Sequence, residues 1–275
     1  MEFLLYIVAL LFTGALVGFT SGLLGVGGGF IMVPVQFFLL TSLGIDPTTA
    51  IRVAFGTSLA VILPTAISGT LGHKRRGAVL TRPTVFMGIS GIIAAFVGGT
   101  LASNIPGDYL KIIFGVLVLV AATWMLVAKY PEYGSEPKKG ILNYLIIGFI
   151  AGILSGLLGI GGGIILVPIL SITMGFSIHR AVGTSTAVLI FTSLGGIIAY
   201  MLNGVNVTGL PPYSIGYVNL IQLITLGIIT VPMAQIGVNA SHKVPERGLR
   251  YLYNAVMFFT GLKMIGVFSW IGIPL

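Results

Sequence analysis

The chain of 275 residues contains no cysteine and few charges. Asp, Glu, Lys and Arg make up only 7% of the sequence, whereas soluble domains average about 25%. Without cysteine there is neither a disulfide framework nor a thiolate metal site. Since 56% of the residues are hydrophobic, more than a soluble fold of this length can bury, we expect an integral membrane protein whose surface largely faces lipid.

Acidic side chains are the scarcest of the charged types. Because none falls within an apolar run, a carboxylate proton relay and a carboxylate cation site across the membrane are disfavoured. The sequence also lacks a Ser-His-Asp set, a His-Glu-x-x-His motif and an aspartate pair, so we expect no enzyme, no metal and no cofactor. The six acidic residues lie in loops or near chain ends, at Glu2, Asp46, Asp108, Glu132, Glu136 and Glu246.

Basic residues outnumber acidic ones and give a net charge of +8. A nucleic-acid-binding protein would gather such charge on one folded face. Here the cations sit in short segments between apolar runs, which is the pattern of Lys and Arg retained on the cytoplasmic side of a membrane. We therefore expect the lipid bilayer, and no nucleic acid, as a partner; the oligomeric state is open.

A repeat organises the chain. The segment Ser-Gly-Leu-Leu-Gly-Val-Gly-Gly-Gly at 21–29 recurs at 155–163 with Ile in place of Val. The repeat predicts two copies of one unit, at 1–128 and 141–275, joined by a hydrophilic linker at 129–140. In both units Val-Pro follows, then Gly-Thr-Ser, then a proline before a short polar turn; these markers lie at 33–34 and 167–168, at 56–58 and 183–185, and at 106 and 245.

Apolar runs follow the same order in both units. Unit one has them at 3–20, 30–43, 51–71, 84–102 and 110–128, and unit two at 141–155, 164–174, 181–202, 218–240 and 249–268. The run after each glycine-rich segment is short, since a helix of about 11 residues covers only ~17 Å of a hydrocarbon core ~30 Å thick. We therefore expect each glycine-rich segment to interrupt a helix within the membrane.

Two topologies compete. If the pieces on either side of each glycine-rich segment cross, the chain makes eight crossings, the units point the same way, and the loop cations divide seven against six. If each segment is the tip of a re-entrant hairpin, each unit crosses three times and unit two is inverted. The division is then eleven against two, with Arg52 and Lys111 opposite the rest. Since cations concentrate on the cytoplasmic side, the second topology is favoured.

We thus expect an all-α polytopic protein of the plasma membrane. Its two inverted repeats each comprise a glycine-tipped re-entrant hairpin and three transmembrane helices, with eight full crossings and parallel repeats as the alternative. The first arm of each hairpin is long enough to cross, which favours the alternative. In the inverted topology the loops at 73–83, 129–140 and 241–250 are cytoplasmic, and the uncharged loop at 203–219 lies outside.

The glycine-rich segments are the strongest candidates for a binding site. Glycine costs about 1 kcal/mol relative to alanine within a helix, and irregular backbone in a bilayer is tolerated where it is buried or lines a cavity. A helix that starts there presents unpartnered N–H groups and a partial positive charge, which suit an anion. Close packing through Gly-x-x-x-Gly spacing is the alternative. Pro34 and Pro168 leave open whether each helix begins at the glycines or nearer the proline.

Hydroxyl and basic side chains near these segments complete the expected site. The Thr-Ser pairs at 57–58 and 184–185 either donate to a bound oxyanion or bond back to helix carbonyls. Arg52 and Arg180 either attract anions to the two mouths or anchor the helices at the interface. His179 is the only nearby group that changes charge around neutral pH, and is a candidate for proton coupling or a plain loop residue. The expected substrate-binding residues are Ser21, Gly25, Gly27, Gly28, Gly29, Thr57, Ser58, Ser155, Gly159, Gly161, Gly162, Gly163, Thr184 and Ser185.

These motifs resemble the TauE/SafE family of sulfite and organosulfonate exporters. The resemblance covers nearly the whole chain and implies outward secondary transport of small sulfur-containing anions such as sulfite, sulfonates or thiosulfate. Unit one departs from unit two by a longer stretch between Pro34 and Gly56. The residues that carry the resemblance are 22–29, their copy at 156–163, Ala-Val-Gly-Thr-Ser at 181–185, Gly-Tyr-Val-Asn at 216–219 and Val-Pro-Glu-Arg at 244–247.

The expected function is therefore export of a small sulfur oxyanion that binds mid-membrane at the two glycine-rich segments. A passive channel or permease for a small uncharged or other anionic solute is the alternative. A structural protein with a glycine-packed helix bundle is a third reading.

Overall fold

The computed structural model describes residues 2–127, 140–241 and 246–267. Nearly all of the expected linker at 129–140 lies outside these residues, as do Val244 and Pro245 of the second unit. The cations at 129, 138, 139 and 243 lie outside them as well.

The described chain is almost entirely helical, which confirms an all-α polytopic membrane protein. Seven of its helices are long and apolar enough to cross a membrane: α1, α3, α4, α5, α6, α8 and α9. The helices are α1 (Glu2–Leu24), α2 (Gly29–Ser42), α3 (Pro47–Arg75), α4 (Thr81–Ala102), α5 (Gly107–Val127), α6 (Ile141–Leu158), α7 (Gly163–Pro168) with the π-helix η1 (Ile169–Thr173), α8 (Ile178–Asn203), α9 (Leu220–Ala240) and α10 (Glu246–Ile265).

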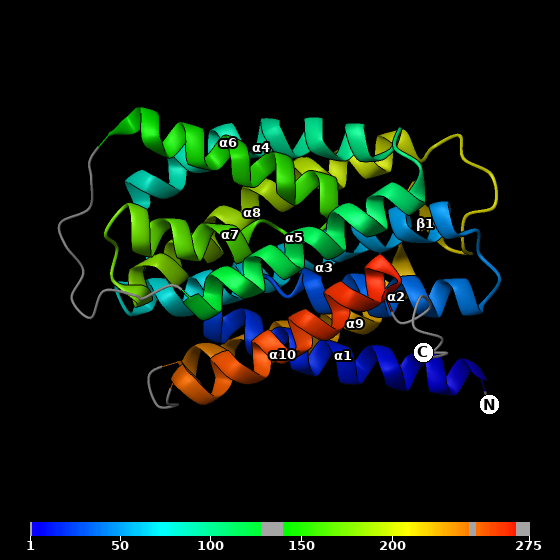
Figure 1. The fold of residues 1–275 in the computed structure, drawn as a ribbon, viewed down its shortest axis with the longest axis horizontal. Coiled ribbons are helices and arrows are strands. Elements are labelled where there is room, and N and C mark those ends of the chain that lie inside the picture. Colours follow the sequence, from blue (N-terminus) through cyan, green and yellow to red (C-terminus); the bar gives the residue numbers. More distant parts are fainter. Residues whose placement is uncertain (1, 128–139, 242–245, 268–275) are drawn as a thin grey trace.

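The helices α1 and α2 form a hairpin that opens at the end of the molecule where α3 begins (Figure 1). Tyr6, early in α1, accepts a hydrogen bond of 2.8 Å from Gln222 at the start of α9. The ring of Phe37, late in α2, lies 5.5 Å from the Nζ of Lys111, near the start of α5. The helices α6 and α7 form a second hairpin, which opens at the opposite end, where α4 and α8 begin. The chain therefore turns back at each glycine-rich segment.

The outer faces of the helices carry large aliphatic and aromatic side chains. Phe12, Ile93, Val120 and Ile228 each leave 60% or more of their surface exposed. The interior instead holds many small and polar residues, among them Thr57, Thr184 and Gln36, which are fully buried. Exposed apolar side chains on several helices match a protein whose solvent is lipid.

Glycine stripes set how closely the hairpins approach their neighbours. A Cβ atom at Gly22 of α1 would lie 2.0 Å from the carbonyl oxygen of Ala234 in α9, and one at Gly156 of α6 would lie 2.0 Å from that of Ala95 in α4. The stripes are Gly14, Gly18 and Gly22 on α1 and Gly148, Gly152 and Gly156 on α6. Backbone-to-backbone contact of this kind is the usual role of small residues in membrane helices.

Two local features differ from the expected apolar runs. The helix α3 begins at Pro47, before the apolar run at 51–71, because Asp46 caps it by accepting from the N–H of Thr49 at 3.0 Å. The loop at 203–219 contains an unexpected hairpin of β1 (Ser214–Ile215) and β2 (Val218–Asn219). This hairpin leads directly into α9.

Gly152→Ala in α6 should destabilise the protein relative to Gly227→Ala in α9. Both changes raise helix propensity, by up to about 1 kcal/mol. A Cβ at Gly152 would lie 2.4 Å from the carbonyl oxygen of Gly91, whereas one at Gly227 would meet nothing within 4 Å. The overpacked variant should lose about 1–3 kcal/mol, measured by thermal unfolding in detergent micelles. Equal unfolding temperatures for the two variants would mean that this helix contact does not govern stability.

Candidate functional site

Both glycine-rich segments break their helices, as the sequence predicts. The φ angles of Gly25, Gly27 and Gly28 are 68°, 82° and 72°, and those of Gly159, Gly161 and Gly162 are 68°, 78° and 87°. L-residues with side chains rarely adopt these left-handed angles, whereas glycine does so at little cost. The glycines of the breaks are therefore needed for their backbone angles, whereas the glycine stripes on α1 and α6 are needed for close helix packing.

The helices that follow begin at the glycines and not at the prolines. Gly28 and Gly162 are the N-caps of α2 and α7, and neither cap carries a side-chain hydrogen bond. The first hydrogen bond of α2 runs from the Ile31 N–H to the Gly28 carbonyl (3.1 Å), and that of α7 runs from the Ile165 N–H to the Gly162 carbonyl (3.2 Å). The backbone N–H groups that precede Ile31 and Ile165 have no acceptor within their own helix. Pro34 lies inside α2, and Pro168 ends α7.

The two breaks touch each other in the interior. A Cβ at Gly29 would lie 2.6 Å from the Cα of Ile160, and a Cβ at Gly163 would lie 2.8 Å from the Cα of Val26. Val26 and Ile160 are themselves buried. Two segments more than a hundred residues apart in the sequence thus pack against each other, and the contact lies where the helices α2 and α7 start.

Three of the four residues in the Thr-Ser pairs form hydrogen bonds to other segments, and one of these bonds reaches a break. Ser185 Oγ donates to the Gly25 carbonyl at 3.1 Å. Thr57 Oγ1 accepts from the N–H of Asn219 (2.9 Å), and Thr184 Oγ1 accepts from that of Leu80 (3.1 Å). The threonine hydroxyls are thus engaged as acceptors by neighbouring segments, and each retains an O–H with which to donate.

Two buried hydroxyls beside the second break have no hydrogen-bond partner. Ser58 and Ser155 are fully buried, and the Oγ of each is unpaired. The Cβ of Ser155 would lie 3.5 Å from a Cβ at Gly162. Ser58 follows Phe55 by one helical turn, and the Phe55 backbone packs directly on Gly159. A buried hydroxyl without a partner is uncommon and costly, so these two donors suit a ligand.

The expected arginines lie at opposite ends of the helices. Arg52 is half-buried and donates to the Tyr217 hydroxyl (3.2 Å) and to the Ile105 carbonyl (2.9 Å). Arg180 and His179 are exposed in the first turn of α8. The structure therefore brings together the glycines and serines of the expected site, but not these three side chains.

His73 is a buried residue that the sequence analysis missed. Its Nε2 lies 3.0 Å from the carbonyl oxygen of Gly22, three residues before the first break. The structure thus adds a second histidine to the surroundings of the glycine-rich segments, which the sequence analysis limited to His179. The repeat contained the signal: His73 lies as far after Thr57 as Tyr200 lies after Thr184. Tyr200 donates in the same way to the Gly156 carbonyl, at 2.9 Å.

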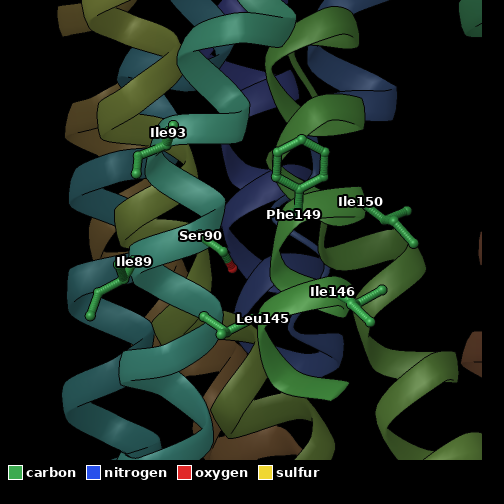
Figure 2. A pocket seen from close by; sticks show the side chains of 7 residues that line it. All are labelled: Ile89, Ser90, Ile93, Leu145, Ile146, Phe149 and Ile150. Atoms are coloured by element: carbon green, nitrogen blue, oxygen red, sulfur yellow. The ribbon is translucent and has the colours of Figure 1, made fainter. Parts of the chain in front are cut away.

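A hollow between α4 and α6 has the wrong lining for an anion (Figure 2). Its only polar side chain is Ser90, whose hydroxyl already bonds to the Phe86 and Met87 carbonyls of its own helix. The remaining lining is apolar and largely exposed: Ile89, Ile93, Leu145, Ile146, Phe149 and Ile150. We read it as a lipid-facing depression.

Comparison with known proteins gives consistent matches over nearly the whole chain. The family model described as Sulfite exporter TauE/SafE matches residues 10–264. A probable membrane transporter protein of Methanocaldococcus jannaschii is 31% identical, over 96% of this chain and 97% of its own. Similar proteins with the same description in Haemophilus influenzae and Bacillus subtilis are each 26% identical, over 94% and 95% of this chain and 98% and 99% of theirs. No solved structure matches the chain.

Ser185→Ala and Ser58→Ala should affect stability differently although the two serines occupy equivalent positions. Ser185→Ala removes a made hydrogen bond and should cost about 1 kcal/mol, whereas Ser58→Ala removes an unpaired hydroxyl and should be neutral or stabilising. Thermal unfolding in detergent without added anion measures both. A larger loss for Ser58→Ala than for Ser185→Ala would contradict the hydrogen-bond pattern.

Proposed function

The chain belongs to the TauE/SafE family of membrane transporters, and on that premise we propose that it is a secondary transporter that exports small sulfur-containing oxyanions across the plasma membrane. Sulfite, sulfonates and thiosulfate are the members of this class that we expect it to carry. The description of the family supports the substrate class. The single structural observation behind the proposal is the contact between the two broken helices.

The helix starts at that contact supply the positive potential. The helix α2 has 14 residues, and α7 continues through η1 as one apolar helix, Gly163–Thr173. Each presents uncapped N–H groups and the positive end of its dipole at the point where the two breaks meet. An oxyanion there would gain hydrogen bonds from backbone that lacks side-chain cover. In this proposal the binding residues are the glycines from 25 to 29 and from 159 to 163.

Hydroxyl groups complete the coordination. Ser58 and Ser155 are the strongest donors because they are buried and unpaired. The other hydroxyl side chains of the proposed site are also fully or nearly fully buried: Ser21 in α1, Thr57 in α3, and Thr184 and Ser185 in α8. A hydrogen bond to a charged group is worth about 1.5–3 kcal/mol, so one such donor changes affinity about tenfold or more.

Ile62 and Leu189 cover the glycines in this conformation. Their side-chain carbons lie 3.1–3.7 Å from the positions that a Cβ would take at Gly27 and Gly161. An anion that reaches the N–H groups must displace these side chains. Such a displacement fits an alternating-access cycle around a central site, in which the cover opens toward one side at a time.

We propose further that the two units are inverted repeats and that each hairpin is re-entrant. The opposite openings of the hairpins and the eleven-to-two division of the cations support this arrangement. The loops at 73–83, 129–140 and 241–250 are then cytoplasmic. Arg52 and Arg180 stand at the outer and inner mouths, where their charge attracts anions. The exposed position of His179 near the inner mouth leaves it a candidate for proton exchange.

Cysteine labelling tests the topology, since the chain has no native cysteine. Lys74→Cys and Thr173→Cys should react with a membrane-impermeant maleimide from the same side, and Val205→Cys only from the other, because α3 ends and α8 begins at one end of the molecule. Labelling of Lys74→Cys and Thr173→Cys from opposite sides would instead support parallel repeats.

Transport in proteoliposomes tests the function. Wild-type protein should carry labelled sulfite and sulfonates in a gradient-dependent way, and Ser58→Ala should raise the substrate concentration for half-maximal transport about tenfold. Ser42→Ala is the control, since Ser42 is exposed and bonds within its own helix. Transport of an uncharged solute but of none of these anions would reject the proposal. Anion flux that ignores every ion gradient would favour a passive channel.

A further inference from the structure

We infer that Gln36 is a further substrate-binding residue, whose amide binds a hydroxyl group at the far end of an organosulfonate held at the two helix breaks. The inference deepens the proposed transport function and rests on it. It assigns to this chain a preference for sulfonates that carry a hydroxyl group at the end opposite the sulfonate.

Gln36 of α2 carries a fully buried amide without a partner. Its side chain is 0% exposed, and neither Nε2 nor Oε1 forms a hydrogen bond among the described residues. The amide nitrogen can donate hydrogen bonds and the oxygen can accept them, so the whole bonding capacity of this side chain is unused. Buried polar groups are hydrogen-bonded in the great majority of cases. A buried side chain with both polar atoms unpaired therefore points to a ligand.

Packing does not require a glutamine at this position. The counterpart of Gln36 in unit two is Leu170, which follows the proline of its unit at the same spacing and is fully buried as well. An apolar side chain of similar volume fills such a place without leaving a donor and an acceptor unpaired. The polar side chain in unit one therefore has a use other than holding the fold.

Gln36 lies on the same face of α2 as the glycine at the helix start. It follows Gly29 by seven residues, which is close to two full turns of an α-helix. This face is buried from one end to the other, and its remaining members are Met32, Val33 and Leu40. At its beginning, a Cβ at Gly29 would lie 2.6 Å from the Cα of Ile160 in the second break. Gln36 therefore belongs to the side of α2 that starts at the contact between the breaks.

The spacing along α2 fits a short organic sulfonate. Seven residues rise about 10 Å along a helix. Side chains in an α-helix lean toward its N-terminus, over the preceding turn, so we expect the amide of Gln36 about one turn, or ~5 Å, from the N–H groups at the helix start. A sulfonate bound by those N–H groups and by Ser58 and Ser155 would hold a substituent on a two-carbon chain next to this amide.

The amide of Gln36 selects the chemistry of that substituent. A hydroxyl group can accept a hydrogen bond from Nε2 or donate one to Oε1, whereas a methyl group leaves both atoms unpaired. A site built to bond a substrate hydroxyl rejects the analogue that lacks it, because its own buried polar atoms then stay without partners. Since the amide is neutral, it offers no charge to hold a second anionic group. The expected ligand is therefore a monoanionic sulfonate with a terminal hydroxyl group.

A matched pair of ligands provides the direct test. The compounds 2-hydroxyethanesulfonate and 1-propanesulfonate carry the same charge and differ by a hydroxyl group in place of a methyl group. Calorimetry on the full-length protein in detergent should show about tenfold tighter binding of the hydroxylated sulfonate, the effect expected of one hydrogen bond to a buried group. Gln36→Leu, which introduces the residue type of unit two, should bind the two sulfonates with similar affinity.

The same substitution at a hydrogen-bonded glutamine is the control. Gln235 of α9 donates to Ser68 Oγ of α3 at 3.0 Å, so Gln235→Leu should lower the unfolding temperature and keep the preference between the two sulfonates. Gln36→Leu removes unpaired polar atoms, so it should not lower the unfolding temperature of the protein without ligand. A purely structural role of Gln36 would give the reverse result, a loss of stability in Gln36→Leu with the preference intact.

The outcomes separate this inference from the transport proposal. Equal affinities of wild-type protein for the two sulfonates, or binding of sulfite but of neither sulfonate, overturn the role of Gln36 and leave anion transport standing. These measurements need no variant to fold. A preference that persists in Gln36→Leu, or in the unbranched and nearly isosteric Gln36→Met, overturns the role of Gln36 as well. Failure of wild-type protein to bind sulfite or either sulfonate rejects both proposals.

Discussion

A backbone contact between two broken helices is the constraint on which the rest of the structure depends. Gly29 packs on Ile160 and Gly163 on Val26 so closely that neither glycine has room for a Cβ. Irregular backbone within a membrane must be buried by protein or line a cavity. The two breaks provide that burial for each other, and the helices α2 and α7 both start there.

Glycine has two separate uses in holding this contact in position. On α1 and α6, glycines at four-residue spacing bring the first arms against α9 and α4 at backbone distance. In the breaks, glycines adopt left-handed angles that end one helix and start the next. The packing reading and the binding-site reading of the sequence are therefore compatible, because they apply to different glycines.

Similar scaffolds in the two halves carry different side chains at the centre. Ser185 is hydrogen-bonded to Gly25, whereas its counterpart Ser58 is unpaired. His73 and Tyr200 occupy equivalent positions and hydrogen-bond to the matching carbonyls of Gly22 and Gly156. The repeated backbone therefore carries two unpaired hydroxyls beside the second break and a buried histidine beside the first.

The sequence by itself determined the membrane class, the repeated glycine-rich segment and the helix breaks at its two copies, because hydropathy, repetition and glycine clusters are local signals. It left open whether the two short helices start at the glycines or nearer to Pro34 and Pro168. It also missed His73, since a histidine at the basic end of a helix is usually exposed to solvent. Only the tertiary structure decided that Gly22 lies against His73 and that Ser58 has no partner. Both facts depend on which helices meet, and close packing between distant segments, which no local pattern encodes, sets that arrangement.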